Sequence, residues 1–389
     1  MLACKQRPLK ATKTFSFLSC NVAKLLSESS SMSHTKLFIP GPIEVSPKTY
    51  QAFSKPVMGH RSKSFQDLYA RVQVGLKKAF YTDQPVFVAT GSSWSVMEAA
   101  IRNLVGKKVL TCMKGAFSDK WYDVALQCGK QAEKLQVPWG TPILPEMIDA
   151  KLATGEFDAV TLIHNETSTG TMSPLWDIAK VMQKYPDISL IVDVVSSFSI
   201  MKVPFDELKI DVMITGVQKA IALPPGAALF AVSEKAFAKA SKLDNRGYYI
   251  DFLEFRKNHE GNMTPTTPSI SHFFALESKL EDFEKEGLDN RHARHMRNAE
   301  IAREWIYRNG FELFPAKEYS SIGLSCVKNT RNVDVAKWIE WLKKNHQCVI
   351  DGGYGKIKGT TFRISHMGDE TEQNVRELLG WLEEGLKAI

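Results

Sequence analysis

Short apolar runs alternate along the chain with segments whose apolar residues recur at helical spacing. Residues 85–90 form one such run, whereas residues 64–80 place Phe65, Leu68 and Val72 three or four positions apart. The same patterns predict strands at 108–112, 158–163, 188–194, 211–216 and 227–232, and helices at 95–104, 118–129 and 174–184. Near-continuous apolar strands separated by helices indicate a parallel sheet covered on both faces.

The pattern changes after about residue 270. A long, charge-rich helical stretch is predicted over 270–309. Shorter elements follow at 311–314, 322–327, 333–345, 361–365 and 371–387. Because 389 residues exceed one compact core, we expect an α/β domain over residues 36–285 and a smaller α+β domain over 286–389.

Composition excludes several classes of protein. Hydrophobic residues make up 44% and charged residues 24%, as in ordinary globular proteins. The chain has no run of 18 apolar residues, so we expect no membrane span. Its six cysteines are scattered without a C-x-x-C pair, which predicts neither a metal site nor a disulfide framework and favours a reducing compartment.

Much of the net charge of +7 lies in residues 1–31, which are Ser/Thr-rich and contain almost no acidic residues. This is the composition of an organelle transit peptide. Alternatively, Met32 is the true start of the protein. We therefore expect a cytoplasmic protein, or an organellar one if the segment is a transit peptide, and we keep residues 1–35 out of the fold. The remaining charge is too small and dispersed to predict nucleic-acid binding.

Two charged residues stand at the ends of predicted apolar strands. Asp193 ends one strand, and Lys219 follows another. Each has an ordinary interpretation, since Asp193 would cap a turn and Lys219 would extend to solvent. Together they match a pyridoxal-phosphate (PLP) site, which needs a lysine for the aldehyde and a carboxylate for the pyridine nitrogen. Burial would also make the lysine amine nucleophilic.

A third segment is suited to a phosphate. Residues 90–94 (Thr-Gly-Ser-Ser-Trp) lie between a predicted strand and a predicted helix. Backbone N–H groups at a helix N-terminus bind anions. A plain turn with a serine N-cap explains the same residues equally well.

In order and spacing, these segments resemble the class V aminotransferases of PLP fold type I, in the alanine–glyoxylate and serine–pyruvate branch. The resemblance runs from about Lys36 to the C-terminus. It rests on the motifs Pro40-Gly-Pro42, Gly59-His-Arg-Ser62, Gly91-Ser-Ser-Trp-Ser95, Gly115-Ala-Phe117, His164-Asn-Glu-Thr-Ser-Thr-Gly170, Val192-Asp193, Gly216-Val-Gln-Lys219 and Phe362-Arg-Ile364. It implies a mainly parallel seven-stranded sheet between helices and a homodimer with shared active sites.

The resemblance also implies a role for each motif residue. Lys219 forms a Schiff base with PLP and then moves the substrate proton, while Asp193 pairs with the ring nitrogen. Arg363 binds the substrate carboxylate near Gly41. The other cofactor-binding positions are Ser92, Ser93, Trp94, Phe117, Thr167, Gln218 and, from a neighbouring subunit, Thr267.

Some positions depart from the family pattern. Several relatives have glycine at Ser93 and tryptophan at Phe117, and many have tyrosine at Thr264. These departures put the phosphate contacts and the contact across subunits in doubt. His60 and Arg61 match a family motif but receive no role.

Three other classes were weighed against an aminotransferase. A lyase such as a cysteine desulfurase needs a mobile cysteine near Arg363, and the sequence offers none there. A non-catalytic PLP-fold subunit would not need Lys219, Asp193 and Arg363. A nucleotide-binding protein would need a glycine-rich phosphate motif, which is missing. We expect transamination from alanine or serine to glyoxylate or pyruvate by a ping-pong mechanism, with aspartate as an alternative donor.

Overall fold

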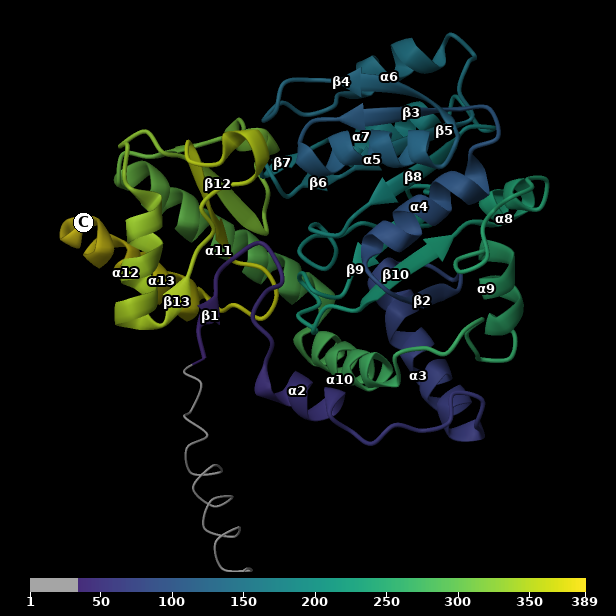
Figure 1. Cartoon of the computed structure of the whole chain (residues 1–389), viewed down its shortest axis with the longest axis horizontal. Helices are drawn as coiled ribbons and strands as arrows, with labels where there is room; N and C mark the ends of the chain where they lie inside the picture. Colours follow the sequence, from purple (N-terminus) through teal and green to yellow (C-terminus); the bar gives the residue numbers. More distant parts are fainter. Residues whose placement is uncertain (1–33) are drawn as a thin grey trace, which may run out of the picture.

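The computed structural model describes residues 34–389, in which a seven-stranded sheet is the largest element (Figure 1). Its strands are β2 (Val86–Thr90), β3 (Lys108–Met113), β4 (Gln131–Gln136), β5 (Ala159–Ile163), β8 (Ser189–Asp193), β9 (Val212–Gly216) and β10 (Ala227–Val232). They lie in the order β2-β10-β9-β8-β5-β3-β4. β10 is antiparallel to both neighbours and the other pairs are parallel. The predicted fold, a mainly parallel sheet between helices, is confirmed.

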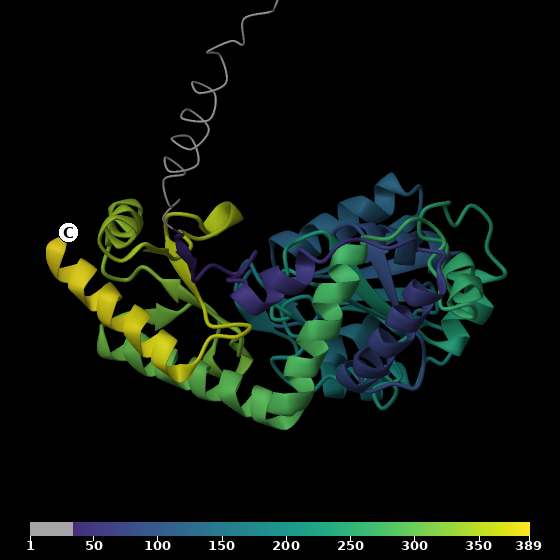
Figure 2. The same ribbon diagram turned by 90° about the horizontal axis from the view of Figure 1, so that it is seen from below.

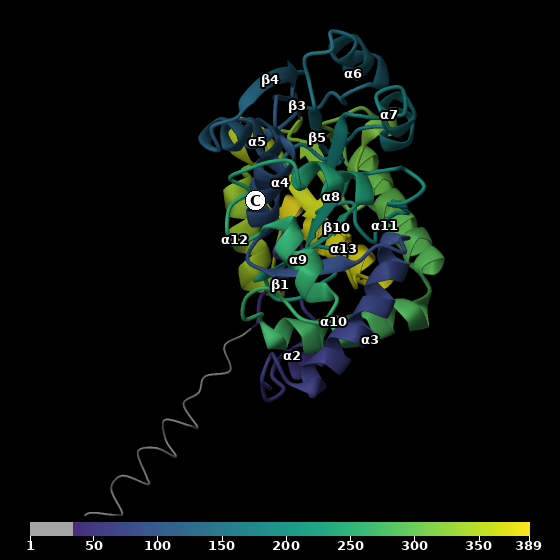
Figure 3. The ribbon, with the colours of Figure 1, turned by 90° about the vertical axis from the view of Figure 1, so that its right-hand side faces the viewer.

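Helices cover both faces of this sheet. One face packs against α3 (Lys63–Phe80), α6 (Pro145–Leu152), α7 (Leu175–Met182) and α10 (Ile270–Glu286), and the other against α4 (Ser93–Leu104), α5 (Ala116–Gln127), α8 (Glu234–Ala240) and α9 (Phe252–His259). Alternate strand residues point to opposite faces, so Val86 and Val88 join the first core and Phe87 and Ala89 the second. Figures 1 and 3 show α3 beside α10 on the first face.

A three-stranded antiparallel sheet forms farther along the chain. It contains β11 (Glu312–Leu313), β12 (Leu324–Lys328) and β14 (Thr361–Ser365), and it packs with α11 (Leu288–Arg308), α12 (Val335–His346) and α13 (Glu372–Ala388). β1 (Lys36–Leu37) pairs with β13 (Cys348–Val349) beside this sheet. The remaining short elements are α2 (Pro47–Phe53), β6 (Asn165–Glu166), β7 (Thr171–Met172), η1 (Lys317–Tyr319) and η2 (Gly355–Ile357). The division of the chain at residue 285 stays a prediction.

The structure differs from the sequence prediction at a few elements. The stretch predicted as one helix over 270–309 is two helices, which meet at a corner in Figure 2. Gly287 has φ +79° there, a conformation that glycine adopts without strain. The sheet also has an edge strand, β4, that was not predicted because its residues are polar and half exposed. Four of the helices (α2, α6, α8 and α9) were not predicted either.

The segment 1–31, for which a transit peptide was considered, lies outside the described residues. Within residues 34–389, no helix combines the length and the apolar character needed to cross a membrane.

Trp338 tests the core around the smaller sheet. Its side chain is fully buried and its indole N–H donates to the Leu382 carbonyl oxygen at 3.2 Å. Trp338→Ala should lower the free energy of unfolding by about 3–5 kcal/mol, because it leaves a cavity. Trp176→Ala, at a side chain that is 40% exposed, should change it by less than about 0.5 kcal/mol. Denaturant unfolding measures both, and equal losses would contradict this account of the core.

Candidate active site

The carboxyl ends of the parallel strands bring the predicted residues together. Asp193 ends β8, Lys219 follows β9, and Ser92 follows β2. Phe117 lies in the first turn of α5, which follows β3. Because these strands run in the same direction, their following loops meet at one edge of the sheet, where ligands bind in open α/β folds.

Lys219 is a buried amine at the centre of this edge. Its Nζ donates to the carbonyl oxygen of Pro40. A Cβ on Gly41 would lie 2.6 Å from that Nζ, so only glycine allows the Pro40–Gly41 segment to approach the lysine. Burial and, to a smaller extent, the positive charge of Arg363 lower the pKa of Lys219 to about 8, against the opposite effect of Asp193. The amine is therefore partly neutral, and nucleophilic, near neutral pH.

Asp193 is a buried carboxylate that lacks a cationic partner. Among the described residues, only the backbone N–H of Val195 donates to it, at 2.6 Å. Burial raises the pKa of Asp193 to about 7, and this hydrogen bond offsets part of the rise. A cation placed against the carboxylate would restore its charge.

Polar groups converge at the N-terminus of α4. Ser92 is the N-cap residue, but its side chain makes no capping hydrogen bond. The hydroxyl of Ser93 is buried without a hydrogen-bond partner in the described structure. A Cβ on Gly216 would lie 2.6 Å from Ser93 Oγ and 2.4 Å from Gln218 Oε1, so these two side chains meet beside that glycine. Together they form a polar cradle at a helix N-terminus, where the serine hydroxyls and the backbone N–H groups can donate.

Glu166 fixes the first turn of α5, which carries Phe117. Its buried carboxylate accepts hydrogen bonds from the N–H and hydroxyl of Ser118, at 3.0 and 2.9 Å, and from the hydroxyl of Ser168 at 2.6 Å. A Cβ on Gly115 would lie 2.3 Å from Glu166 Cγ, which explains the glycine there. The negative charge also lies at the positive end of the helix. The position of Phe117 therefore depends on Glu166.

Arg363 joins the two sheets at the site. Its Nε donates to Asp351 Oδ1 at 2.7 Å, and its Nη1 donates to the carbonyl oxygen of Thr167 at 2.9 Å. The Thr167 hydroxyl donates to Ser196 Oγ at 2.8 Å. The side chain of Arg363 is buried, and its Nη2 is left without a hydrogen bond to the described residues.

The structure does not bring every predicted residue into this cluster. Thr267 is exposed on the loop between α9 and α10, and Ser269 of that loop donates its N–H to Thr90 at 3.0 Å. Trp94 lies at the start of α4, with the Lys120 amine 5.2 Å from its ring centre. His60 and Arg61 lie in the turn before α3.

Sequence reasoning missed four residues of the site, namely Lys114, Glu166, Asp351 and Tyr354. Glu166 belongs to a quoted motif, but nothing in the sequence pointed to its serine partners. Lys114 is fully buried and donates to His164 O at 2.9 Å and Ser173 Oγ at 2.7 Å. Burial lowers its pKa to about 7. Its position directly after an apolar strand, like that of Lys219, was the available signal.

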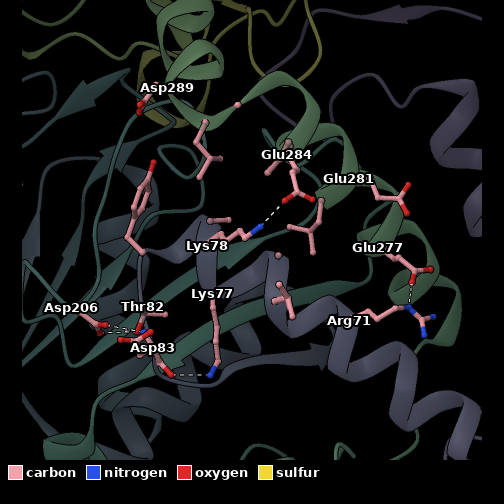
Figure 4. Close-up of a pocket in the computed structure, with 18 residues that line it drawn as sticks. Arg71, Lys77, Lys78, Thr82, Asp83, Asp206, Glu277, Glu281, Glu284 and Asp289 are labelled. Carbon is pink, nitrogen blue, oxygen red and sulfur yellow. Dashed lines mark hydrogen bonds and ion pairs between the residues drawn. The ribbon is translucent and has the colours of Figure 1, made fainter.

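A separate cavity of about 820 Å³ lies between α3 and α10 (Figure 4). Several of its rim charges are already paired, including Arg71 with Glu277 at 2.7 Å and Lys78 with Glu284 at 2.6 Å. It contains none of the predicted site residues.

The chemistry of the cluster at the sheet edge fits PLP. The unpartnered hydroxyl of Ser93 at the N-terminus of α4 suits the phosphate. The buried Asp193, without a cation, suits a protonated pyridine nitrogen. The buried amine of Lys219 suits the aldehyde.

Comparison with known proteins agrees with this assignment. The family model described as aminotransferase class-V matches residues 48–378. An uncharacterised aminotransferase of Methanocaldococcus jannaschii is 36% identical over 91% of this chain and 93% of its own length. A serine–glyoxylate aminotransferase of Methylorubrum extorquens is 30% identical over 86% and 87%. The crystal structure of an aspartate aminotransferase from Thermus thermophilus superposes with a TM-score of 0.84, at 28% identity, over 91% of this chain and 99% of the other.

The matched region contains the seven-stranded and the three-stranded sheet and every residue of the cluster except Pro40 and Gly41. The chain therefore belongs to the class V aminotransferases, enzymes that use pyridoxal phosphate to move amino groups between small amino acids and oxo acids.

Proposed function

We propose that the enzyme transfers the amino group of alanine or serine to a 2-oxo acid, glyoxylate or pyruvate. The observation that carries this proposal is the closeness of Arg363 to Lys219, since the guanidinium charge is the largest cause, after burial, of the lysine's lowered pKa. A guanidinium beside the reactive amine is suited to an α-carboxylate, and its free Nη2 is available for one. The donor named for one relative is serine and for another aspartate, so names alone do not choose the substrate.

In this proposal, Lys219 both holds the cofactor and moves the proton. Once the donor's amine had replaced it at the aldehyde, the freed, partly neutral amine of Lys219 would accept the proton of the substrate Cα and then donate it again. The bound cofactor supplies an electron-withdrawing ring that makes the Cα proton removable. Asp193 keeps the ring nitrogen protonated. The keto product leaves before the acceptor binds, which gives ping-pong kinetics.

The remaining side chains position the cofactor and the substrate. Phe117 would stack on the ring. The hydroxyl of Thr167, which donates to Ser196 Oγ in the structure, would turn to donate to an oxygen of the bound cofactor. Gly41 leaves room for the substrate beside Lys219. The phosphate is assigned to Ser92, Ser93, Trp94 and Gln218.

The experiment that tests the reaction is absorbance of the PLP-loaded protein, with alanine, serine or aspartate added separately and no acceptor present. Bleaching of the long-wavelength band by alanine or serine, and its return with glyoxylate or pyruvate, supports the proposal. Bleaching by aspartate alone would show that aspartate is the donor in place of alanine or serine. A band that none of the three amino acids changes would reject the proposed transamination.

A lyase that uses a cysteine is disfavoured by the described thiols. Cys326 pairs with Arg363 in the smaller sheet, but burial raises the pKa of its thiol to about 12, so it stays protonated. Burial also raises the pKa of Cys112 and Cys348, and the four described cysteines are all free. Free thiols support a reducing, cytoplasmic location.

Replacing Lys219 tests its role. Lys219→Ala should lower turnover by roughly 100- to 10,000-fold, because the general base is lost. Borohydride should then no longer fix PLP to the chain, which mass spectrometry measures. Lys180→Ala, at an exposed lysine paired with Asp177 at 2.9 Å, is the control and should behave as wild type. Unchanged turnover in Lys219→Ala would reject the assignment.

The lowered pKa of Lys219 predicts a pH dependence for cofactor binding. The neutral amine attacks the aldehyde, so the rate of binding to the apoprotein should rise with pH and reach half its maximum near pH 8. An exposed lysine would give a midpoint near about 10.4. Stopped-flow absorbance between pH 6.5 and 10.5 measures the rate, and a midpoint above pH 10 would show that burial does not lower this pKa.

We also propose a homodimer in which Thr267 reaches the cofactor phosphate of the neighbouring subunit. Thr267 is exposed, and so are Val57 (72%) and Tyr248 (89%), large apolar side chains that favour a covered surface. Sedimentation should give twice the chain mass, and Thr267→Ala should weaken PLP binding by about 10-fold, as loss of one charged hydrogen bond predicts. A monomer that binds PLP normally would contradict the proposal.

A further inference from the structure

Tyr354 lies between the two side chains assigned to the cofactor ring and to the substrate carboxylate. Its ring stacks on Phe117 with centres 5.2 Å apart and planes 20° from parallel. The guanidinium carbon of Arg363 is 5.4 Å from the Tyr354 ring centre. The side chain is 43% exposed, so part of the ring remains free to contact a ligand. No role was predicted for this residue from the sequence.

The turn that carries Tyr354 is fixed to Arg363 by one carboxylate. Asp351 Oδ1 accepts a hydrogen bond from the Gly353 N–H at 2.9 Å and another from Arg363 Nε at 2.7 Å. Gly353 has φ +87°, and a Cβ there would lie 2.7 Å from the Thr361 carbonyl oxygen. The turn therefore lies directly against β14, and the distance between Tyr354 and Arg363 is set by the fold.

The other side of the turn contacts Trp139, in the loop that follows β4 of the larger sheet. A Cβ on Gly355 would lie 2.9 Å from the Trp139 ring, and the Lys356 amine lies 4.3 Å from the centre of that ring. Trp139 in turn donates its indole N–H to Asp119 Oδ2 at 3.0 Å. Lys356 is the cation of this turn, and these contacts hold its amine over the Trp139 ring.

We propose that Tyr354 is a specificity-determining residue, whose ring forms the wall that limits the substrate side chain to small, uncharged groups. The inference rests on the proposed role of Arg363 as the carboxylate anchor. An amino acid held by Arg363 has its Cα a few bonds from the guanidinium, so a long side chain on the side of Tyr354 meets the ring. The face of an aromatic ring is electronegative and disfavours a carboxylate. Alanine and serine therefore fit this wall better than aspartate.

A binding measurement tests the wall without turnover. The PLP-loaded protein, in the oligomeric state in which it is purified, is titrated by calorimetry with propanoate, 3-phenylpropanoate and succinate. These acids carry no amino group that could react. Wild type and Tyr354→Phe should bind propanoate and discriminate against the two larger acids. Tyr354→Ala should reduce the discrimination against 3-phenylpropanoate by about tenfold or more, as removal of a steric wall predicts. Because Tyr354 is partly exposed, the alanine variant should fold.

The outcomes distinguish the proposed role of Tyr354 as a steric wall from the proposed role of Arg363 as the carboxylate anchor. If Tyr354→Ala leaves the ratio of affinities unchanged, or if Tyr354→Phe loses the discrimination as well, the wall is rejected. Arg363→Gln should weaken all three acids alike. If Arg363→Gln does not weaken the binding of all three acids, Arg363 is not the carboxylate anchor. The reason for placing the substrate against Tyr354 is then lost as well.

Discussion

The structure depends on keeping two opposite charges, Lys219 and Asp193, buried at the carboxyl edge of one sheet. Burial lowers the pKa of the lysine to about 8 and raises that of the aspartate to about 7. Both groups therefore change charge close to neutral pH. A buried charge without a partner costs several kcal/mol. In our proposal, a cofactor with an aldehyde and a ring nitrogen would compensate both groups. The site is thus prepared for its ligand by burial itself.

Two other carboxylates, the buried Glu166 and the partly buried Asp351, hold the surrounding loops in place. Glu166 anchors the first turn of α5 and hence Phe117, whereas Asp351 joins the turn of Tyr354 to Arg363. Phe117 lies in α5, which covers the larger sheet, whereas Arg363 lies in β14 of the smaller sheet, and Tyr354 contacts both side chains. In our proposal, the wall that limits the substrate side chain is therefore set by contacts between these two parts of the fold, while Lys219 and Asp193 follow or end strands of the larger sheet.

The residues proposed as reactive could be singled out from the sequence because they stand at the ends of strongly apolar strands. Asp193 ends β8 and Lys219 follows β9, two strands that are buried on both faces and therefore have mainly apolar sequences. β4 was missed since it is a polar edge strand, and the break at Gly287 was missed since helical spacing continues on both sides. The stacking of Tyr354 on Phe117 was unpredictable because the fold alone brings these distant residues together. Thr267 stays a prediction, as its proposed contact belongs to a second chain.

The central claim is that Asp193 compensates the ring nitrogen of the cofactor while Lys219 holds its aldehyde. The most direct measurement is the ¹⁵N chemical shift of PLP labelled at the ring nitrogen and bound to the wild-type protein and to Asp193→Asn. The account predicts a protonated nitrogen in the wild type at neutral pH and an unprotonated one in the variant. An unprotonated nitrogen in the wild type, or the same shift in both proteins, would contradict it.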